Sequence, residues 1–171
     1  MVDYAKIVLD TAITVFNGQK KAGSKTRIPI ESDRDVYIVG IEYNDTDVTL
    51  CYWKNGQKVT LPSAGYVMID DFVVSGSDVY VLGSEFADGT VNHCYWKNGS
   101  LTTLSTHCSS ANSIFILEED VYIAGDDEWV LFDDPPYQFY VSKACYWKNG
   151  TKIELSNNGN ANGIVVVKKE N

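Results

Sequence analysis

The six-residue sequence CYWKNG occurs three times in the chain without a change. Each copy ends a longer unit that begins with Asp-Val-Tyr, and these units start 43 and then 42 residues apart, at Asp35, Asp78 and Asp120. Self-similarity at such a period indicates that one supersecondary unit has been copied along the chain. The copies of CYWKNG lie at residues 51–56, 94–99 and 145–150.

Each unit is predicted to form four short strands. In the third unit, an apolar run over 112–119 is followed by the alternating sequence DVYIAG, and then by ACYW and TKIELS. Asn-Gly joins the last two runs and favours a two-residue hairpin, because a type I′ turn needs positive φ at both central residues. Four strands that repeat every 40 to 50 residues, roughly, are typical of β-propeller blades.

The repeat also resembles that of uncharacterised bacterial propeller-like proteins, which carry a Tyr-Trp-Lys-Asn-Gly core beside a Val-Tyr-Gly strand. The resemblance covers most of the chain from Asp35 to Ser156. It implies a β-propeller fold and carries almost no information about a ligand. The chain departs from the pattern in its N-terminal part, which lacks the Tyr-Trp pair, and in an insertion in the third unit.

The two ends of the chain supply the pieces of one further unit. The C-terminal sequence ANGIVVVKKEN aligns with ANSIFILEED of the third unit and provides a first strand only. The N-terminal sequence resembles degenerate second, third and fourth strands, with Phe16-Asn17-Gly18 in the place of Lys-Asn-Gly. Pairing of these ends would close a ring and remove its open strand edges.

We therefore predict an all-β fold: a small β-propeller of four blades, each of four antiparallel strands, with a closing blade shared by the two termini. A length of 171 residues suits a single domain. The alternative is an open partial ring that completes eight blades by dimerising, and we expect a monomer rather than a dimer. The predicted blades span 27–62, 66–105, 111–156, and 161–171 together with 1–24.

The composition limits the class of partner. A formal net charge of −9 argues against nucleic acid and anionic membranes, because both attract clustered Lys and Arg. No apolar run reaches the length of about 18 residues that would predict a membrane span. The N-terminus lacks the basic and then apolar layout of a secretory signal. We expect a cytoplasmic protein, or a secreted one from which a signal peptide has been removed.

In each copy of the repeat, Cys precedes Trp by two residues, so the two side chains share one face of a strand. We expect both to pack between neighbouring blades; the alternative is one aromatic sugar-binding platform per blade. Cysteines on separate blades are too far apart for disulfides, and their spacing fits no zinc site, so free thiols and a reducing compartment are favoured. The pairs are Cys51 and Trp53, Cys94 and Trp96, and Cys145 and Trp147.

Nothing in the sequence favours catalysis. His107 adjoins Cys108, but neighbouring residues of a strand point to opposite faces and so do not normally share a proton. His93 is the only other histidine, and no phosphate-binding glycine loop or nucleophile elbow occurs. We predict a protein that is not an enzyme, with no catalytic residue, no cofactor and no metal site.

The third unit carries nine extra residues within the sequence DDEWVLFDDPPYQFYVSK (126–143). Insertions on rigid scaffolds often carry binding residues. Aromatic rings beside carboxylates suit sugar faces and hydroxyls, or a basic peptide. Two simpler interpretations stay open: a longer hairpin whose aromatic side chains fold back on the blade, and a Ca²⁺ site at the Asp-Asp pairs, which lack EF-hand spacing. The candidate ligand-binding residues are Trp129, Phe132, Asp133, Asp134, Tyr137, Phe139 and Tyr140.

These observations predict a non-enzymatic binding module that presents the insertion to a carbohydrate or a protein ligand. The alternative function is a structural module whose repeat surfaces pack against further copies of the chain and complete a larger ring.

Overall fold

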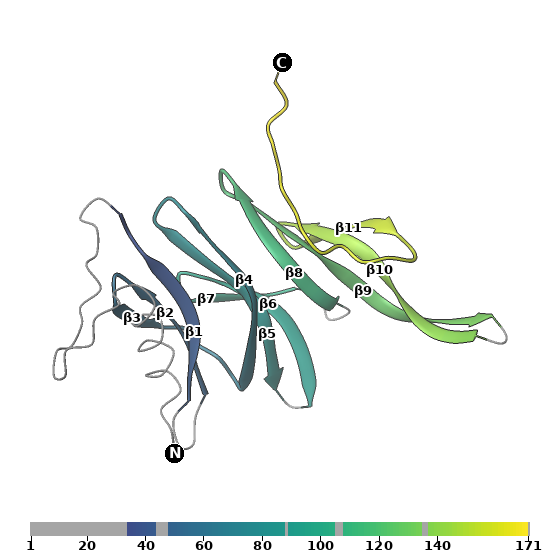
Figure 1. Cartoon of the computed structure of the whole chain (residues 1–171), viewed down its shortest axis with the longest axis horizontal. Helices are drawn as coiled ribbons and strands as arrows, with labels where there is room; N and C mark the ends of the chain where they lie inside the picture. Colours follow the sequence, from purple (N-terminus) through teal and green to yellow (C-terminus); the bar gives the residue numbers. More distant parts are fainter. Residues whose placement is uncertain (1–33, 44–47, 88, 105–107, 135–136, 171) are drawn as a thin grey trace, which may run out of the picture. The chain divides into compact units, whose positions relative to one another are not determined.

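The computed structural model describes residues 34–43, 48–87, 89–104, 108–134 and 137–170 (Figure 1). These residues form eleven strands, every strand pair is antiparallel, and no helix occurs among them. The predicted all-β class is therefore confirmed. The described residues contain no helix that could span a membrane. The chain divides into two compact units, Met1–Leu61 and Pro62–Asn171.

The first unit holds a three-stranded sheet in the order β1-β2-β3. Its strands match the second, third and fourth strands expected of the first repeat. The first strand expected of that blade falls within residues 27–33, outside the described residues. The strands are β1 (Tyr37–Tyr43), β2 (Val48–Lys54) and β3 (Gln57–Thr60).

The second unit holds two four-stranded sheets, each a meander of consecutive strands, as expected for two complete repeats. One sheet contains β4 (Tyr66–Ser75), β5 (Asp78–Ala87), β6 (Thr90–Lys97) and β7 (Ser100–Thr103). The other contains β8 (Cys108–Leu117), β9 (Asp120–Asp134), β10 (Tyr137–Lys148) and β11 (Thr151–Ser156).

The Asn-Gly turns have the predicted geometry. Asn55, Asn98 and Asn149 have φ values of 52°, 50° and 49°, and the glycine that follows each of them also has positive φ. Both central residues of each turn therefore lie in the left-handed region, as a type I′ hairpin requires. In the third copy, this turn joins Lys148 directly to Thr151.

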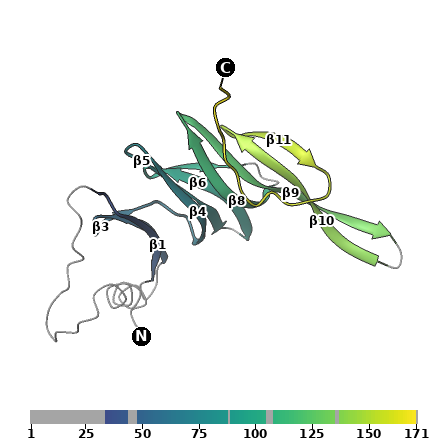
Figure 2. The same cartoon turned by 45° about the horizontal axis from the view of Figure 1, so that its top comes forward.

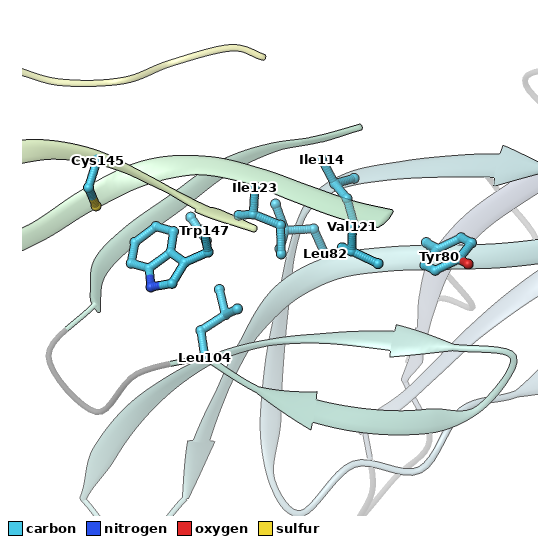
Figure 3. Close-up of a cluster of buried hydrophobic side chains, with 9 residues drawn as sticks. Tyr80, Leu82, Leu104, Ile114, Val121, Ile123, Cys145 and Trp147 are labelled. Atoms are coloured by element: carbon cyan, nitrogen blue, oxygen red, sulfur yellow. The ribbon is translucent and has the colours of Figure 1, made fainter. Parts of the chain in front are cut away.

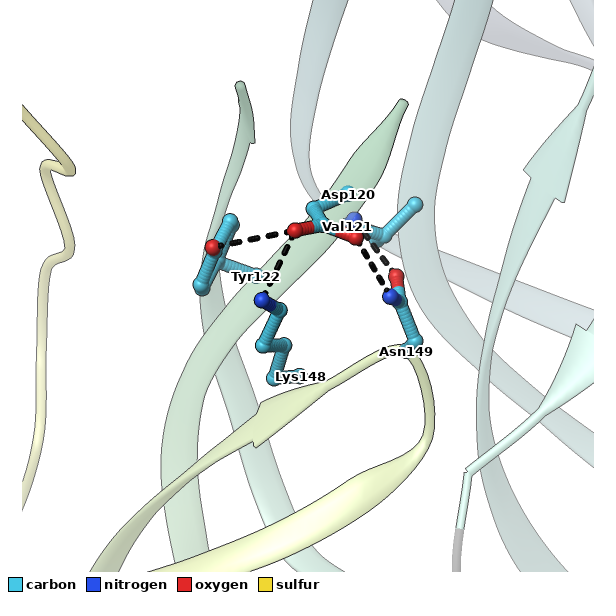
Figure 4. A network of polar contacts seen from close by, with 5 residues as sticks. All are labelled: Asp120, Val121, Tyr122, Lys148 and Asn149. Atoms are coloured by element: carbon cyan, nitrogen blue, oxygen red, sulfur yellow. Dashed lines mark hydrogen bonds and ion pairs between the residues drawn. The ribbon is translucent and has the colours of Figure 1, made fainter. Parts of the chain in front are cut away.

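The same asparagines fasten each turn to the Asp-Val-Tyr end of the second strand (Figure 4). Val121 N donates a hydrogen bond of 2.8 Å to Asn149 Oδ1, and Asn149 Nδ2 donates one of 2.7 Å to Asp120 Oδ1. Lys148 Nζ forms an ion pair of 2.7 Å with Asp120 Oδ2, and the same nitrogen lies 5.3 Å from the centroid of the Tyr122 ring. The other two copies repeat these contacts, with Asn55 on Asp35 and Asn98 on Asp78. The structure thus explains why Lys-Asn-Gly and Asp-Val-Tyr recur together.

The two sheets of the second unit pack face to face (Figure 3). Trp147 is 1% exposed and packs in one cluster with Tyr80 and Leu82 of β5 and with Leu104, which directly follows β7. The first strands of the sheets also meet, because Asp71 accepts a hydrogen bond of 2.9 Å from Ile114 N. Packing between sheets, predicted for the repeated Trp, is confirmed at this position.

The repeated cysteines are buried free thiols. Burial is the main cause that raises the pKa of Cys51 to about 11 and that of Cys94 and Cys145 to about 12. The corresponding Trp96 is 0% exposed, and its Nε1 donates a hydrogen bond of 2.7 Å to Pro62 O. Because Trp96 and Trp147 are inaccessible, a sugar-binding platform at either residue is excluded.

The strand expected over 161–171 is not formed: residues 157–170 carry no strand, and residue 171 lies outside the described residues. The segment is nevertheless attached to the sheet of β8–β11, where Asn112 Nδ2 donates a hydrogen bond of 2.9 Å to Ala161 O (Figure 2). Beyond this point the side chains alternate, with Val165 74% and Val167 77% exposed and Ile164 and Val166 half-buried. A strand needs a partner, and the partners expected for this one fall within 1–24, outside the described residues.

Candidate functional site

The insertion in the third repeat is a long two-stranded extension of β9 and β10. These strands pair from Tyr137 opposite Asp134 to Lys148 opposite Tyr122. The neighbouring strands end much earlier, because β8 pairs with β9 only as far as Asp127. Residues 128–134 and 137–142 therefore form a ribbon beyond the four-stranded sheet (Figures 1 and 2). We refer to these residues as the β-ribbon.

A register shift between Ser142 and Lys143 marks the base of the β-ribbon. An extra residue on one strand of an antiparallel pair bends that strand and increases its twist. The bulge therefore separates the regular sheet from its extension. On the other side of this point, the last strand, β11, pairs with β10 only from Ala144 onward.

All seven candidate ligand-binding residues lie on the β-ribbon. Its backbone register places Phe132 opposite Phe139 and Asp134 opposite Tyr137. The other candidates face residues that the sequence analysis did not select. The insertion is thus a longer hairpin, and its role in binding stays a prediction. These remaining pairs are Trp129 with Ser142, Leu131 with Tyr140, and Asp133 with Gln138.

Asp126, at the base of the β-ribbon, holds the C-terminal segment against the sheet. Its side chain is buried and accepts a hydrogen bond of 2.9 Å from Ala161 N and another of 2.9 Å from Asn160 Nδ2. Ser110 Oγ donates a third, at 2.8 Å. Gly159 N also donates a hydrogen bond of 3.0 Å to Ser142 O. Asp126 therefore has a structural role that accounts for its burial.

Asp127 is 0% exposed and forms an ion pair with Lys152. The hydrogen bond that Lys152 donates to Asp127 is the largest cause that raises the pKa of Lys152. Asp127 Oδ1 has no hydrogen-bond partner among the described residues. Removal of Lys152 would leave a buried carboxylate without a counter-ion, which is strongly unfavourable.

The Asp127–Lys152 pair has a counterpart in the first unit, where Lys58 pairs with Glu42. The sheet of β4–β7 differs, because Leu101 occupies the position of the lysine and Glu85 instead accepts a hydrogen bond of 2.9 Å from Ala64 N. The carboxylates at these positions thus belong to the repeat itself. No group of three or more metal-ligating side chains occurs among the described residues, so no observation supports a Ca²⁺ site at Asp126 and Asp127.

Of the two histidines, only His93 lies within the described residues. Burial is the main cause that lowers the pKa of His93, whose backbone hydrogen bond with Ser109 acts in the opposite direction. A thiol with a pKa as high as that of Cys94, about 12, is a poor nucleophile at neutral pH. His107 and the side chain of Cys108 lie outside the described part of the structure, and so does the pairing considered for them.

Two features of this region were not predicted from the sequence. Leu131 on the β-ribbon is 47% exposed. It was not selected from the sequence because it lies in the apolar run WVLF, which does not distinguish exposed from buried positions. Asn160 joins Asp126 and Ser142 through hydrogen bonds of 2.9 Å each. The role of Asn160 could have been suspected from the sequence, because the next residue, Ala161, aligns with Ala111 at the start of a repeat.

Comparison with known proteins places the chain in no family. No family model matches it. No curated protein matches it. No solved structure matches it.

Proposed function

We propose that the protein is a non-enzymatic binding module and that the β-ribbon presents its ligand-binding surface. The observation that carries this proposal is the departure from the repeat: β9 and β10 continue past the last residues of β8 and β11. In the equivalent hairpin of the second repeat, β5 and β6 end at the pair Ala87–Thr90. The sheet therefore does not need the extension for its own stability, and selection for binding is a sufficient reason for it.

The ligand we propose is a carbohydrate or a protein segment. The β-ribbon sequence is rich in aromatic residues and carries carboxylates at Glu128, Asp133 and Asp134, with no Lys or Arg from 128 to 142. This composition suits stacking on sugar rings and acceptance of hydroxyl hydrogen bonds, or contact with a basic segment. It does not suit nucleic acid, whose phosphates these carboxylates would repel.

We further propose that the scaffold is a four-bladed β-propeller closed by residues 161–171 and 1–24. The supporting observation is a difference in exposure between equivalent positions. Ile38 is 43% exposed, whereas the equivalent Val81 and Ile123 are 0% and 1% exposed. In a closed ring, the strands of the shared blade would cover Ile38 as the preceding sheet covers Ile123. The open segment at Val165 would receive its missing partner strand in the same step.

Self-assembly is the second candidate function. The same apolar residues, Val36 and Ile38 of the first unit and Val165 and Val167 of the second, would be buried equally well between two copies that complete a larger ring. The two candidates differ in mass and in the effect of the β-ribbon. A binding module is a monomer that loses its ligand when the β-ribbon is removed, whereas this assembly module is an oligomer with or without the β-ribbon.

The decisive variant replaces residues 130–141 by Asp-Gly. Trp129 and Ser142 are directly opposite each other, so a two-residue turn closes the shortened hairpin and leaves the Asp126 and Asp127 contacts intact. Thermal unfolding of both chains is measured against mono- and oligosaccharides and basic peptides, and mass is measured by light scattering. A ligand at 100 times its dissociation constant adds about 2.7 kcal/mol.

A stabilising ligand whose effect disappears in the shortened chain supports the proposed site, and Trp129→Ala with Tyr137→Ala then tests its aromatic residues. If a ligand stabilises both chains equally, the site lies elsewhere on the scaffold. If no ligand acts and both chains have the mass of an oligomer, the protein is an assembly module.

A further inference from the structure

The described part of the chain contains five Asn-Gly sequences, and this dipeptide is open to spontaneous rearrangement. Glycine has no Cβ, so its backbone nitrogen can approach the side-chain carbonyl carbon, Cγ, of the preceding asparagine. The reaction needs two freedoms: the asparagine side chain must be able to turn, and the glycine N–H must be available. The five pairs are residues 55–56, 98–99, 149–150, 158–159 and 162–163.

The three pairs in the repeated turns lack the first freedom. Asn149 accepts a hydrogen bond of 2.8 Å from Val121 N and donates one of 2.7 Å to Asp120, so its side-chain amide is held on both sides. Its backbone is fixed as well, with φ of 49° in a tight hairpin. Asn55 and Asn98 make the equivalent two hydrogen bonds. Attack on Cγ in these turns would require both hydrogen bonds to break.

The pair at 158–159 lacks the second freedom. The Asn158 side chain is exposed and makes no hydrogen bond within the described residues, but Gly159 N donates a hydrogen bond of 3.0 Å to Ser142 O. The nucleophile of the reaction is therefore occupied. The backbone of Asn158 is held too, because its N–H donates to Ser156 Oγ at 3.2 Å.

The pair at 162–163 has both freedoms. Asn162 and Gly163 are exposed, and neither makes a hydrogen bond to any described residue. Apart from its two chain neighbours, no residue has an atom within 4 Å of the place where a Cβ on Gly163 would be. The hydrogen bonds that attach the C-terminal segment end one residue earlier, at Ala161, with Asp126 and Asn112, and the next contact along the segment is the surface ion pair of Lys168 with Glu118.

We propose that Asn162–Gly163 is a site of spontaneous deamidation in the folded protein. The Gly163 amide nitrogen attacks Asn162 Cγ, a C–N bond forms, and the side-chain nitrogen leaves as ammonia, which gives a five-membered succinimide. Water then opens the ring at one of its two carbonyl groups. One product has aspartate at 162, and the other has isoaspartate, in which the main chain runs through the former side chain.

The two products have different consequences for the strand that 161–171 is expected to form. Asp70 and Asn112 occupy the equivalent position at a register shift of β4 and β8, so aspartate at 162 is compatible with such a strand. Isoaspartate adds one carbon atom to the main chain and displaces the alternation of residues 164–167. This consequence rests on the proposed ring closure. The deamidation rests instead on the exposure of Asn162 and Gly163 outside any strand, which ring closure would reduce.

The test compares the folded chain with the chain unfolded in urea, both incubated in mildly alkaline buffer. Peptide mass mapping measures deamidation at each of the five pairs, and an isoaspartate methyltransferase assay identifies the rearranged product. We expect Asn162 to react at the same rate in both states. The other four pairs should be slowed about tenfold or more by folding, because their reaction requires local opening.

Two variants provide the controls. Gly163→Ala should suppress the reaction at 162, since its Cβ hinders the attack, and Asn158→Ala should leave it unchanged. If Asn149 or Asn158 reacts first in the folded chain, or if folding protects Asn162 as strongly as the others, the assignment is wrong. A failure to bind any ligand leaves this measurement unaffected, so the two proposals can fail separately.

Discussion

Replacement of Asn149 by glycine tests whether the repeated sequence is more than a turn. Glycine adopts a φ of 49° without strain, so Asn149→Gly keeps the type I′ hairpin. It removes the hydrogen bond that Val121 N donates to Asn149 Oδ1 and the one that Asn149 Nδ2 donates to Asp120 (Figure 4). The substitution therefore removes the side-chain hydrogen bonds of Asn149 and leaves the geometry of the turn unchanged.

The magnitude depends mainly on Val121. This residue is 7% exposed, so loss of its acceptor leaves a backbone N–H with little access to water, and such a loss costs about 1–3 kcal/mol. The bond to Asp120 lies at the surface and adds a smaller amount. We expect Asn149→Gly to lower the free energy of unfolding by about 1–2 kcal/mol. Asn149→Ala should cost about 1 kcal/mol more, because alanine is disfavoured at positive φ.

The assay is urea and thermal unfolding, in which each kcal/mol corresponds to about 2–4 °C for a chain of this size. Asn158→Ala is the matched control, since that side chain is exposed and makes no hydrogen bond among the described residues; it should change stability by less than about 0.5 kcal/mol. A double-mutant cycle with Asp120→Ala measures the coupling between the two side chains. Wild-type stability in Asn149→Gly together with zero coupling would refute the argument and leave the asparagine as a turn residue only.

Two further predictions concern charge. Leu101→Lys should form with Glu85 the ion pair that the other two sheets have. We expect it to raise the free energy of unfolding of the second unit by about 0.5 kcal/mol in urea. Leu101→Gln is the control, and an equal effect of both substitutions would rule out the ion pair. Hydrogen bonds from Lys148 and then Asn149 lower the pKa of Asp120 below 3.8, so its contribution to stability is present above pH 3.8 and is lost as the pH falls through the folded-state pKa. The stability difference between wild type and Asp120→Asn should therefore shrink on acidification, and a difference that grows would contradict this sign.

The repeat made the local structure of this chain predictable. Strand alternation and Asn-Gly are properties of a few neighbouring residues, so the four-stranded units and the positive φ of Asn55, Asn98 and Asn149 could be inferred from the sequence alone. Burial of Trp147 was predictable for a similar reason, because Cys and Trp two residues apart share one face of a strand.

The hydrogen bond between Asn149 and Asp120 was not predictable in the same way. These residues are 29 positions apart, and the insertion makes this separation longer than the 20 of the other two copies. Their contact depends on the register between β9 and β10, which a turn sequence alone does not specify. The turn was therefore predictable from Asn149 and Gly150, whereas the hydrogen bonds of Asn149 to Val121 and Asp120 were not.

By itself, the sequence determined the class of fold, the number of strands in each complete repeat, and the place where the repeat is interrupted, because these follow from local periodicity. Only the tertiary structure decided that the insertion is a β-ribbon, that Asp126 holds the C-terminal segment, and that Val165 and Val167 are left open. These features arise from pairing and burial between segments far apart in the chain. Whether a residue is covered depends on its neighbours in space, and two copies with the same sequence can have different neighbours.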